Sequence, residues 1–117
     1  KLKERKVRII ITSDHGTVRV QNPSKIIGDK ATTTNLRYKT GKNLNFNEKE
    51  VFFVKNPEEA LLPKSNLSSS YVFAKEDYYF CYPNNYNHFV NYYRNTFQHG
   101  GVSIEEMIVP VAVFESK

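Results

Sequence analysis

The sequence predicts an α/β fold, and three patterns support this prediction. Residues 7–11 form a β-branched apolar run, which is typical of a strand buried in an α/β sheet. Residues 107–114 form a second apolar run and predict a final strand, in which Pro110 favours an edge or a bulge. Between these runs, strand-like stretches and short helical patterns follow one another without a repeat, a low-complexity tract or a linker. We therefore expect a sheet with flanking short helices in a chain of 117 residues.

The first half of the chain after residue 16 is predicted to be mostly extended. The expected elements before residue 31 are a short strand at 17–20, a loop at Pro23 and Ser24, and a stretch at 25–30 that is either extended or a single turn. They are followed by an extended stretch at 32–39, a turn at 41–43 and a strand at 49–54. A short helix that starts at Asn47 is the alternative to the strand at 49–54. The many threonines and β-branched residues, which favour strands over helices, support these assignments.

The second half contains the predicted helices. Asn56 as a cap and Pro57 at the first helical position predict a short helix over 56–62. The later expected elements are a polar loop at 65–70, a hairpin of strands 71–74 and 78–82, a helix at 85–96, and one helical turn opened by the capping box of Ser103 and Glu106. The acidic pair Glu105 and Glu106 suits the first turn of that helix better than a catalytic dyad.

Charge and cysteine content limit the function classes. The net charge of +5 and the isoelectric point near 9.3 favour anionic partners through long-range attraction. The single cysteine, Cys81, excludes an internal disulfide and a cysteine-rich zinc cluster, and it fits a reducing cytoplasm. No stretch approaches the ~18 consecutive apolar residues that span a membrane. We expect a cytoplasmic protein without a membrane span.

Asp14, His15 and Gly16 directly follow the first predicted strand. Gly16 can adopt a positive φ, so the chain can turn there and the two preceding side chains can converge. A carboxylate beside an imidazole at the carboxyl end of a buried strand suits a cation such as Zn²⁺. The residues alone also allow a plain turn, in which Asp14 bonds its own backbone and His15 is solvated.

A second glycine-flanked histidine, His99, lies before the final predicted strand. The chain has only three histidines, and His15 and His99 are the two that stand beside glycine and next to apolar strands. His88 instead opens the predicted helix at 85–96, where a capping or packing role is favoured over ligation. Asp14, His15 and His99 are all suitable ligands for a divalent metal, and the residues alone make a single site of these three conceivable.

The order of these two motifs resembles the alkaline phosphatase superfamily. Ser-Asp-His-Gly at 13–16 is followed by His-Gly-Gly-x-Ser-x-Glu-Glu-Met-x-x-Pro at 99–110, a form that is similar to the PglZ branch. The stretches 12–39 and 82–88 resemble the PglZ domains of PorX response regulators, which are associated with type IX secretion. The resemblance covers nearly the whole chain and implies that residues 1–117 are the C-terminal part of a larger PglZ domain, with no second domain in the chain.

The resemblance also implies a two-zinc site. Asp14 and His15 would hold one ion and His99 the other, and a pair of ions about 3.5–4 Å apart clamps the attacking and leaving oxygens of a phosphoryl transfer. The remaining ligands and a Thr or Ser nucleophile would come from earlier strands, so we expect no catalytic residue in this chain and no activity from it alone. An apolar strand without its neighbours favours pairing with another chain, which predicts a homodimer or a strand swap.

Two further groups of side chains are candidates for binding. Asn35 and Arg37, with Lys39, alternate along the predicted extended stretch and are expected either to contact substrate or simply to face solvent. The tyrosines and phenylalanines of 78–93 either stack bases, as in single-strand binders, or form core with polar tips.

These observations lead to three functional hypotheses. The leading one is part of a metal-dependent phosphohydrolase, phosphodiesterase-like, that acts on a phosphoester or nucleotide-type substrate. The PorX resemblance implies a two-component response regulator with signalling partner proteins. The alternative is a non-catalytic signalling or partner-binding module with a structural metal. The third is a nucleic-acid binder that uses the basic and aromatic residues without a metal.

Overall fold

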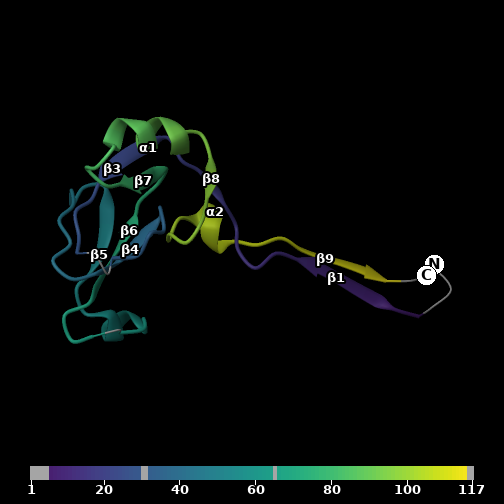
Figure 1. Ribbon diagram of the computed structural model, residues 1–117. Coiled ribbons are helices and arrows are strands. Elements are labelled where there is room, and N and C mark those ends of the chain that lie inside the picture. The colour runs from purple at the N-terminus through teal and green to yellow at the C-terminus, as the bar shows by residue number, and fades with distance from the viewer. Residues whose placement is uncertain (1–5, 30–31, 65, 116–117) are drawn as a thin grey trace.

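The computed structural model describes residues 6–29, 32–64 and 66–115. It consists of a body of short strands and helices from which one long ribbon of two strands projects (Figure 1). The ribbon is β1 (Arg8–Thr12) paired antiparallel with β9 (Val111–Glu115). Because the ribbon extends beyond the body, the molecule measures 58 × 35 × 23 Å.

The body contains three further groups of paired strands. They are the antiparallel sheet of β4 (Tyr38–Gly41), β6 (Ser70–Ala74) and β5 (Val51–Val54) with β6 in the centre, the parallel pair of β3 (Asn22–Lys25) and β7 (Tyr78–Cys81), and the antiparallel pair of β2 (Val18–Arg19) and β8 (Phe97–Gln98). The helices are a 3₁₀ turn η1 (Pro57–Ala60), α1 (Tyr86–Tyr93) and the single turn α2 (Ile104–Met107). None of the helices in the described residues is long and apolar enough to cross a membrane.

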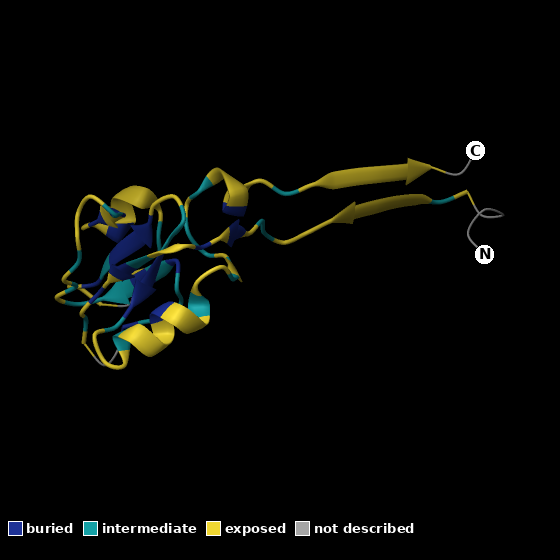
Figure 2. Ribbon diagram, turned by 90° about the horizontal axis from the view of Figure 1, so that it is seen from above, coloured by how far each residue is buried: buried dark blue, intermediate teal, exposed yellow. Residues whose placement is uncertain are grey.

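The core lies in the body and not in the ribbon (Figure 2). One cluster packs Val20 and Tyr79 against Val90 of α1, and the Tyr79 hydroxyl donates a 2.7 Å hydrogen bond to the Val90 carbonyl. A second cluster joins Phe80 of β7 to Val72 of β6. These contacts fix α1 and β7 against the central sheet, so the body has a buried interior despite its short elements.

The structure confirms several predicted elements. The strand expected at 49–54 is β5, the helix expected at 85–96 is α1, and the helix expected at 56–62 is the shorter η1. The capping box predicted the single turn α2, in which both reciprocal hydrogen bonds between Ser103 and Glu106 are present.

Two predicted connections are wrong. The expected hairpin does not form, because β4 and β5 occupy both edges of β6 and β7 pairs with β3 instead. Pro23 and Ser24, expected in a loop, lie in β3. Pro23 is tolerated because β7 is the one strand partner of β3 within the described residues, so the missing N–H costs no second ladder bond.

The prediction that the first strand is buried is also wrong. All five residues of β1 are exposed, and Ile10 and Ile11 are 61% and 57% exposed. The β-branched pattern identified the strand correctly, but among the described residues β9 is its only strand partner. Pro110 lies directly before β9 and therefore does not interrupt the strand. Its carbonyl oxygen accepts a 2.8 Å hydrogen bond from the Thr12 hydroxyl of the paired strand.

Candidate metal centre

The turn that follows β1 is packed against the backbone of α2. The Gly16 N–H donates a 2.8 Å hydrogen bond to the Glu106 carbonyl. A Cβ atom at Gly16 would lie 1.9 Å from the Glu105 carbonyl oxygen, which is closer than any side chain can approach. Glycine is therefore required here by close backbone approach, and the contact brings the Asp14–His15 turn to the segment that carries His99.

The structure brings His15 and His99 together as a stacked pair. Their ring centroids are 3.6 Å apart and their planes are within 7° of parallel. Each side chain comes from a glycine-containing loop, and the two loops meet where the ribbon joins the body. Two of the three predicted ligands are therefore in direct contact although they lie near opposite ends of the sequence.

The hydrogen bonding of His15 identifies which of its ring nitrogens is free to bind a metal ion. Its Nδ1 lies 2.8 Å from the Gly16 carbonyl oxygen, which is only an acceptor. Nδ1 must therefore carry the proton, and in the neutral ring Nε2 keeps its lone pair. The Oδ1 atom of Asp14 lies 3.7 Å from this Nε2. Two ligands of a tetrahedral Zn²⁺, each about 2 Å from the ion, are separated by roughly 3.3 Å, so these two atoms are close to a chelating arrangement.

The donor set found here is smaller than a complete metal site. The Asp14 side chain is 89% exposed and that of His15 is 36% exposed, so both can be reached from solvent. Among the described residues, no group of three or more His, Cys, Asp or Glu side chains is arranged to hold a metal ion. The residues present fit part of a zinc centre, one carboxylate and one imidazole nitrogen side by side, with a second imidazole stacked on the first.

Asn35 connects the loop of His99 to the body. Its Nδ2 atom donates to the His99 carbonyl at 3.4 Å, while its Oδ1 atom accepts hydrogen bonds from the N–H groups of Arg37 and Tyr38 at 2.7 and 3.1 Å. Gly100, which follows His99, has a φ of 104°, and a Cβ atom there would lie 2.9 Å from Asn35 Nδ2. Asn35 therefore lies next to the candidate site and contacts the backbone of its third candidate ligand, while its predicted contact with substrate stays a prediction.

Arg37 has a structural role that differs from both expectations for it, contact with substrate and exposure to solvent. Its side chain is fully buried, and its Nε and Nη2 atoms donate to the two carboxylate oxygens of Glu106 at 2.8 and 2.9 Å. The remaining contacts go to the carbonyls of Glu76 and Tyr78. The guanidinium is therefore engaged inside the body and does not face a ligand, because the extended stretch presents this side inward.

Sequence reasoning identified Glu106 only as a helix cap and missed its wider role. Besides Arg37, its carboxylate accepts hydrogen bonds from the Gly101 N–H at 3.0 Å and from the Ser103 hydroxyl at 2.7 Å. Burial by itself would raise the pKa of Glu106, but the hydrogen bonds from Arg37, Ser103 and Gly101 together hold that pKa below its ordinary value. A charged Glu106 thus fixes the Gly100–Gly101 segment that follows His99. The capping-box spacing was the only sequence signal for this residue.

His88 lies on α1, away from the stacked pair. Its ring stacks on Tyr92 at 6.1 Å and meets Phe89 edge-on at 5.2 Å, and both partners belong to the same helix. These contacts agree with the packing role that was favoured for this histidine.

One comparison with known proteins gives a match. A family model described as the BREX system PglZ alkaline phosphatase-like domain matches residues 2–114. No curated protein matches the chain. The match spans both histidine motifs and the body between them.

Proposed function

Because the chain belongs to the PglZ family of alkaline phosphatase-like domains, we propose that it supplies three ligands to a zinc-dependent phosphodiesterase site. Asp14 and His15 hold one ion and His99 holds a second. The other ligands and the nucleophile are contributed from outside these 117 residues. The substrate class is a phosphoester of the nucleotide type, and the net charge of +5 favours such an anion.

The stacked pair of His15 and His99 is the observation that supports this proposal most. Imidazole lone pairs lie in the plane of the ring, so two nearly parallel rings stacked on one another cannot both direct a lone pair toward one ion. The ring separation of 3.6 Å is similar to the spacing of about 3.5–4 Å between the ions of two-metal sites. The pair therefore suits two ions better than one.

When bound, a zinc pair polarises a phosphoryl oxygen and supplies a water or alkoxide nucleophile at neutral pH. The residues of this chain bind and orient. The Gly16 carbonyl accepts a hydrogen bond from His15 Nδ1 and so fixes the tautomer in which Nε2 is the ligating nitrogen. A ligating histidine is commonly fixed by such an acceptor on its other ring nitrogen. Asn35 and Glu106 hold the loop that carries His99.

The resemblance of residues 12–39 and 82–88 to PorX proteins supports a finer proposal. In it the domain belongs to a two-component response regulator of the type IX secretion system, acts in the cytoplasm as a homodimer and binds signalling partners. The alternative is a non-catalytic signalling module whose metal is structural. Metal binding without phosphodiester hydrolysis would favour that alternative.

The test measures metal content and hydrolysis of bis(p-nitrophenyl) phosphate by the complete protein. We expect His15→Ala and His99→Ala each to lower bound zinc and to reduce turnover at least 100-fold, since ligand loss removes an ion. His88→Ala is the matched control and should leave both unchanged. Equal losses from His88→Ala with intact folding, or full turnover of His99→Ala, would overturn the assignment.

A further inference from the structure

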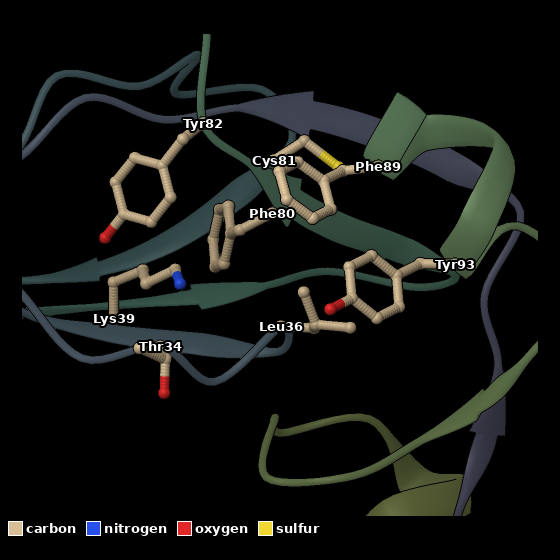
Figure 3. A pocket seen from close by; sticks show the side chains of 8 residues that line it. All are labelled: Thr34, Leu36, Lys39, Phe80, Cys81, Tyr82, Phe89 and Tyr93. Atoms are coloured by element: carbon tan, nitrogen blue, oxygen red, sulfur yellow. The ribbon is translucent and has the colours of Figure 1, made fainter. Parts of the chain in front are cut away.

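A cavity of ≈ 200 Å³ lies between α1 and the sheet, and none of the candidate metal ligands lines it (Figure 3). Its walls are mostly rings, from Phe80 of β7 and from Phe89 and Tyr93 of α1, and Leu36 forms its floor. Ligand sites typically combine such apolar walls with one or two placed polar groups. Here those groups are the Lys39 ammonium and the Tyr93 hydroxyl, which point toward each other across the cavity (Figure 3).

Lys39 is the unusual member of this lining. The residue is only 1% exposed, so its charge is removed from bulk water. Its Nζ atom donates one hydrogen bond to the Thr33 carbonyl at 2.9 Å and lies 4.7 Å from the centre of the Tyr82 ring. Both partners are neutral, and within the described part of the chain no carboxylate forms an ion pair with Lys39.

A buried ammonium without a counter-ion is costly, and proteins rarely keep one without a reason. The cost is visible in the acid–base behaviour of the group, because desolvation by burial lowers the pKa of Lys39 to about 8. An ammonium also has three donors, and among the residues that the structure describes only one of them has a hydrogen-bonding partner. The site therefore has a positive charge and donor capacity that an anion from outside would complete.

We propose that this cavity binds a small planar carboxylate, with the Lys39 ammonium as its counter-ion and the Tyr93 hydroxyl as a second donor. The flat body of the ligand packs between the rings of Phe80 and Phe89. One buried cation balances one negative charge, so a monoanion suits the site better than a phosphate monoester, which carries nearly two. This site is separate from the metal centre and does not depend on it.

The size of the cavity limits the ligand to about one ring. A protein cavity of about 150 Å³ is enough to hold benzene. The ≈ 200 Å³ found here therefore accommodates a six-membered ring with its carboxylate, and not a nucleoside. Benzoate is accordingly a suitable probe, benzamide is its neutral isostere, and acetate has the charge without the ring.

The test is calorimetric titration of the complete protein at pH 7 and low salt, with a chelator present so that carboxylates do not bind metal. We expect saturable one-to-one binding of benzoate, at least ten-fold tighter than that of benzamide or acetate. Lys39→Met keeps an unbranched side chain, one atom shorter and without the charge, and should remove the preference for benzoate over benzamide. Lys55→Met, at an exposed position outside the cavity, is the matched control and should bind benzoate as the wild type does.

The comparison of benzoate with benzamide on the wild-type protein needs no variant, so it decides the proposal even if Lys39→Met does not fold. Equal affinities for the two probes, or no saturable binding of benzoate, would overturn it. Phe89→Trp enlarges a ring of the wall at a position that is 36% exposed, and it should block benzoate. Unchanged benzoate binding by folded Lys39→Met or by folded Phe89→Trp would likewise reject the site.

Discussion

The two carboxylate oxygens of Glu106 accept hydrogen bonds from Arg37 at 2.8 and 2.9 Å, in a contact whose side chains are 1% and 0% exposed. This ion pair joins the segment before β4 to α2, and through the Gly101 N–H it reaches the loop of His99. Arg37 also donates to the carbonyls of Glu76 and Tyr78, so one guanidinium connects three separate parts of the body. The loops that carry the candidate ligands are therefore held in place by a buried pair that is not itself among those candidates.

Glu106→Gln should be strongly destabilising. The amide keeps the shape of the side chain but leaves the Arg37 charge buried without its counter-ion, and breaking such a pair costs about 3–5 kcal/mol. Urea unfolding at pH 7 measures the loss. Glu105→Gln, at the exposed neighbouring position, should change the free energy of unfolding by less than about 0.5 kcal/mol. Similar losses from the two variants would mean that the pair does not stabilise the fold.

The same pair predicts a loss of stability in acid. The folded-state pKa of Glu106 lies below the ordinary value of 4.5, so between these two values the unfolded chain binds more protons than the folded one. Stability then rises with pH in this window and is lost as the pH falls through the folded pKa. The free energy of unfolding is measured for the wild type and for Glu106→Gln from pH 6 to pH 2. The difference between the two free energies should shrink below about pH 4.5. A difference that stays constant over this range would contradict the prediction.

Gly16→Ala should disrupt the junction of ribbon and body. The added Cβ atom would meet the Glu105 carbonyl oxygen at 1.9 Å and the Ile108 carbonyl oxygen at 2.8 Å, and backbone of α2 cannot move aside as a side chain can. We expect a loss of more than about 2 kcal/mol, in the range of overpacked sites, together with weaker zinc binding. Thermal unfolding and metal content measure the two effects.

Gly41→Ala is the matched control for that variant. Its nearest neighbour would be the Thr32 hydroxyl at 2.7 Å, a side-chain atom that can rotate away. The control should cost less stability and leave zinc binding unchanged. A Gly16→Ala protein as stable as the wild type, with full zinc content, would show that the close approach to α2 is not needed.

Local patterns and the family resemblance together gave the candidate ligands, whereas burial and long-range pairing could not be predicted. A strand followed by a glycine turn is a local signal that drew attention to Asp14 and His15, but the turn alone also fitted a site without a metal, and the resemblance made them ligand candidates. The partner of Arg37 was missed because Glu106 is 69 residues away in the sequence, and no pattern near either residue indicates the pairing. The exposure of β1 was missed for a related reason, since an apolar strand pattern gives no information about which segment covers it.

The last prediction uses the buried charge of Lys39. Its pKa is about 8 in the folded protein, against the ordinary lysine value of 10.5 in the unfolded chain. Between these values the unfolded state binds more protons, so the stability of the wild type should rise with pH across this window, by about 1.4 kcal/mol for each pH unit.

Lys39→Met has no group to titrate there, and the difference in stability between the two proteins separates the effect of Lys39 from that of the tyrosines. Burial also raises the pKa of the neighbouring Cys81 thiol, from 9.0 to about 11, but this thiol is present in both proteins, so the comparison between them removes its own contribution. Urea unfolding of both proteins from pH 7 to pH 10.5 gives the measurement. At pH 7 the methionine variant should be the more stable, and its advantage should shrink as the pH rises; an advantage that does not change with pH would show that Lys39 is not destabilised by burial.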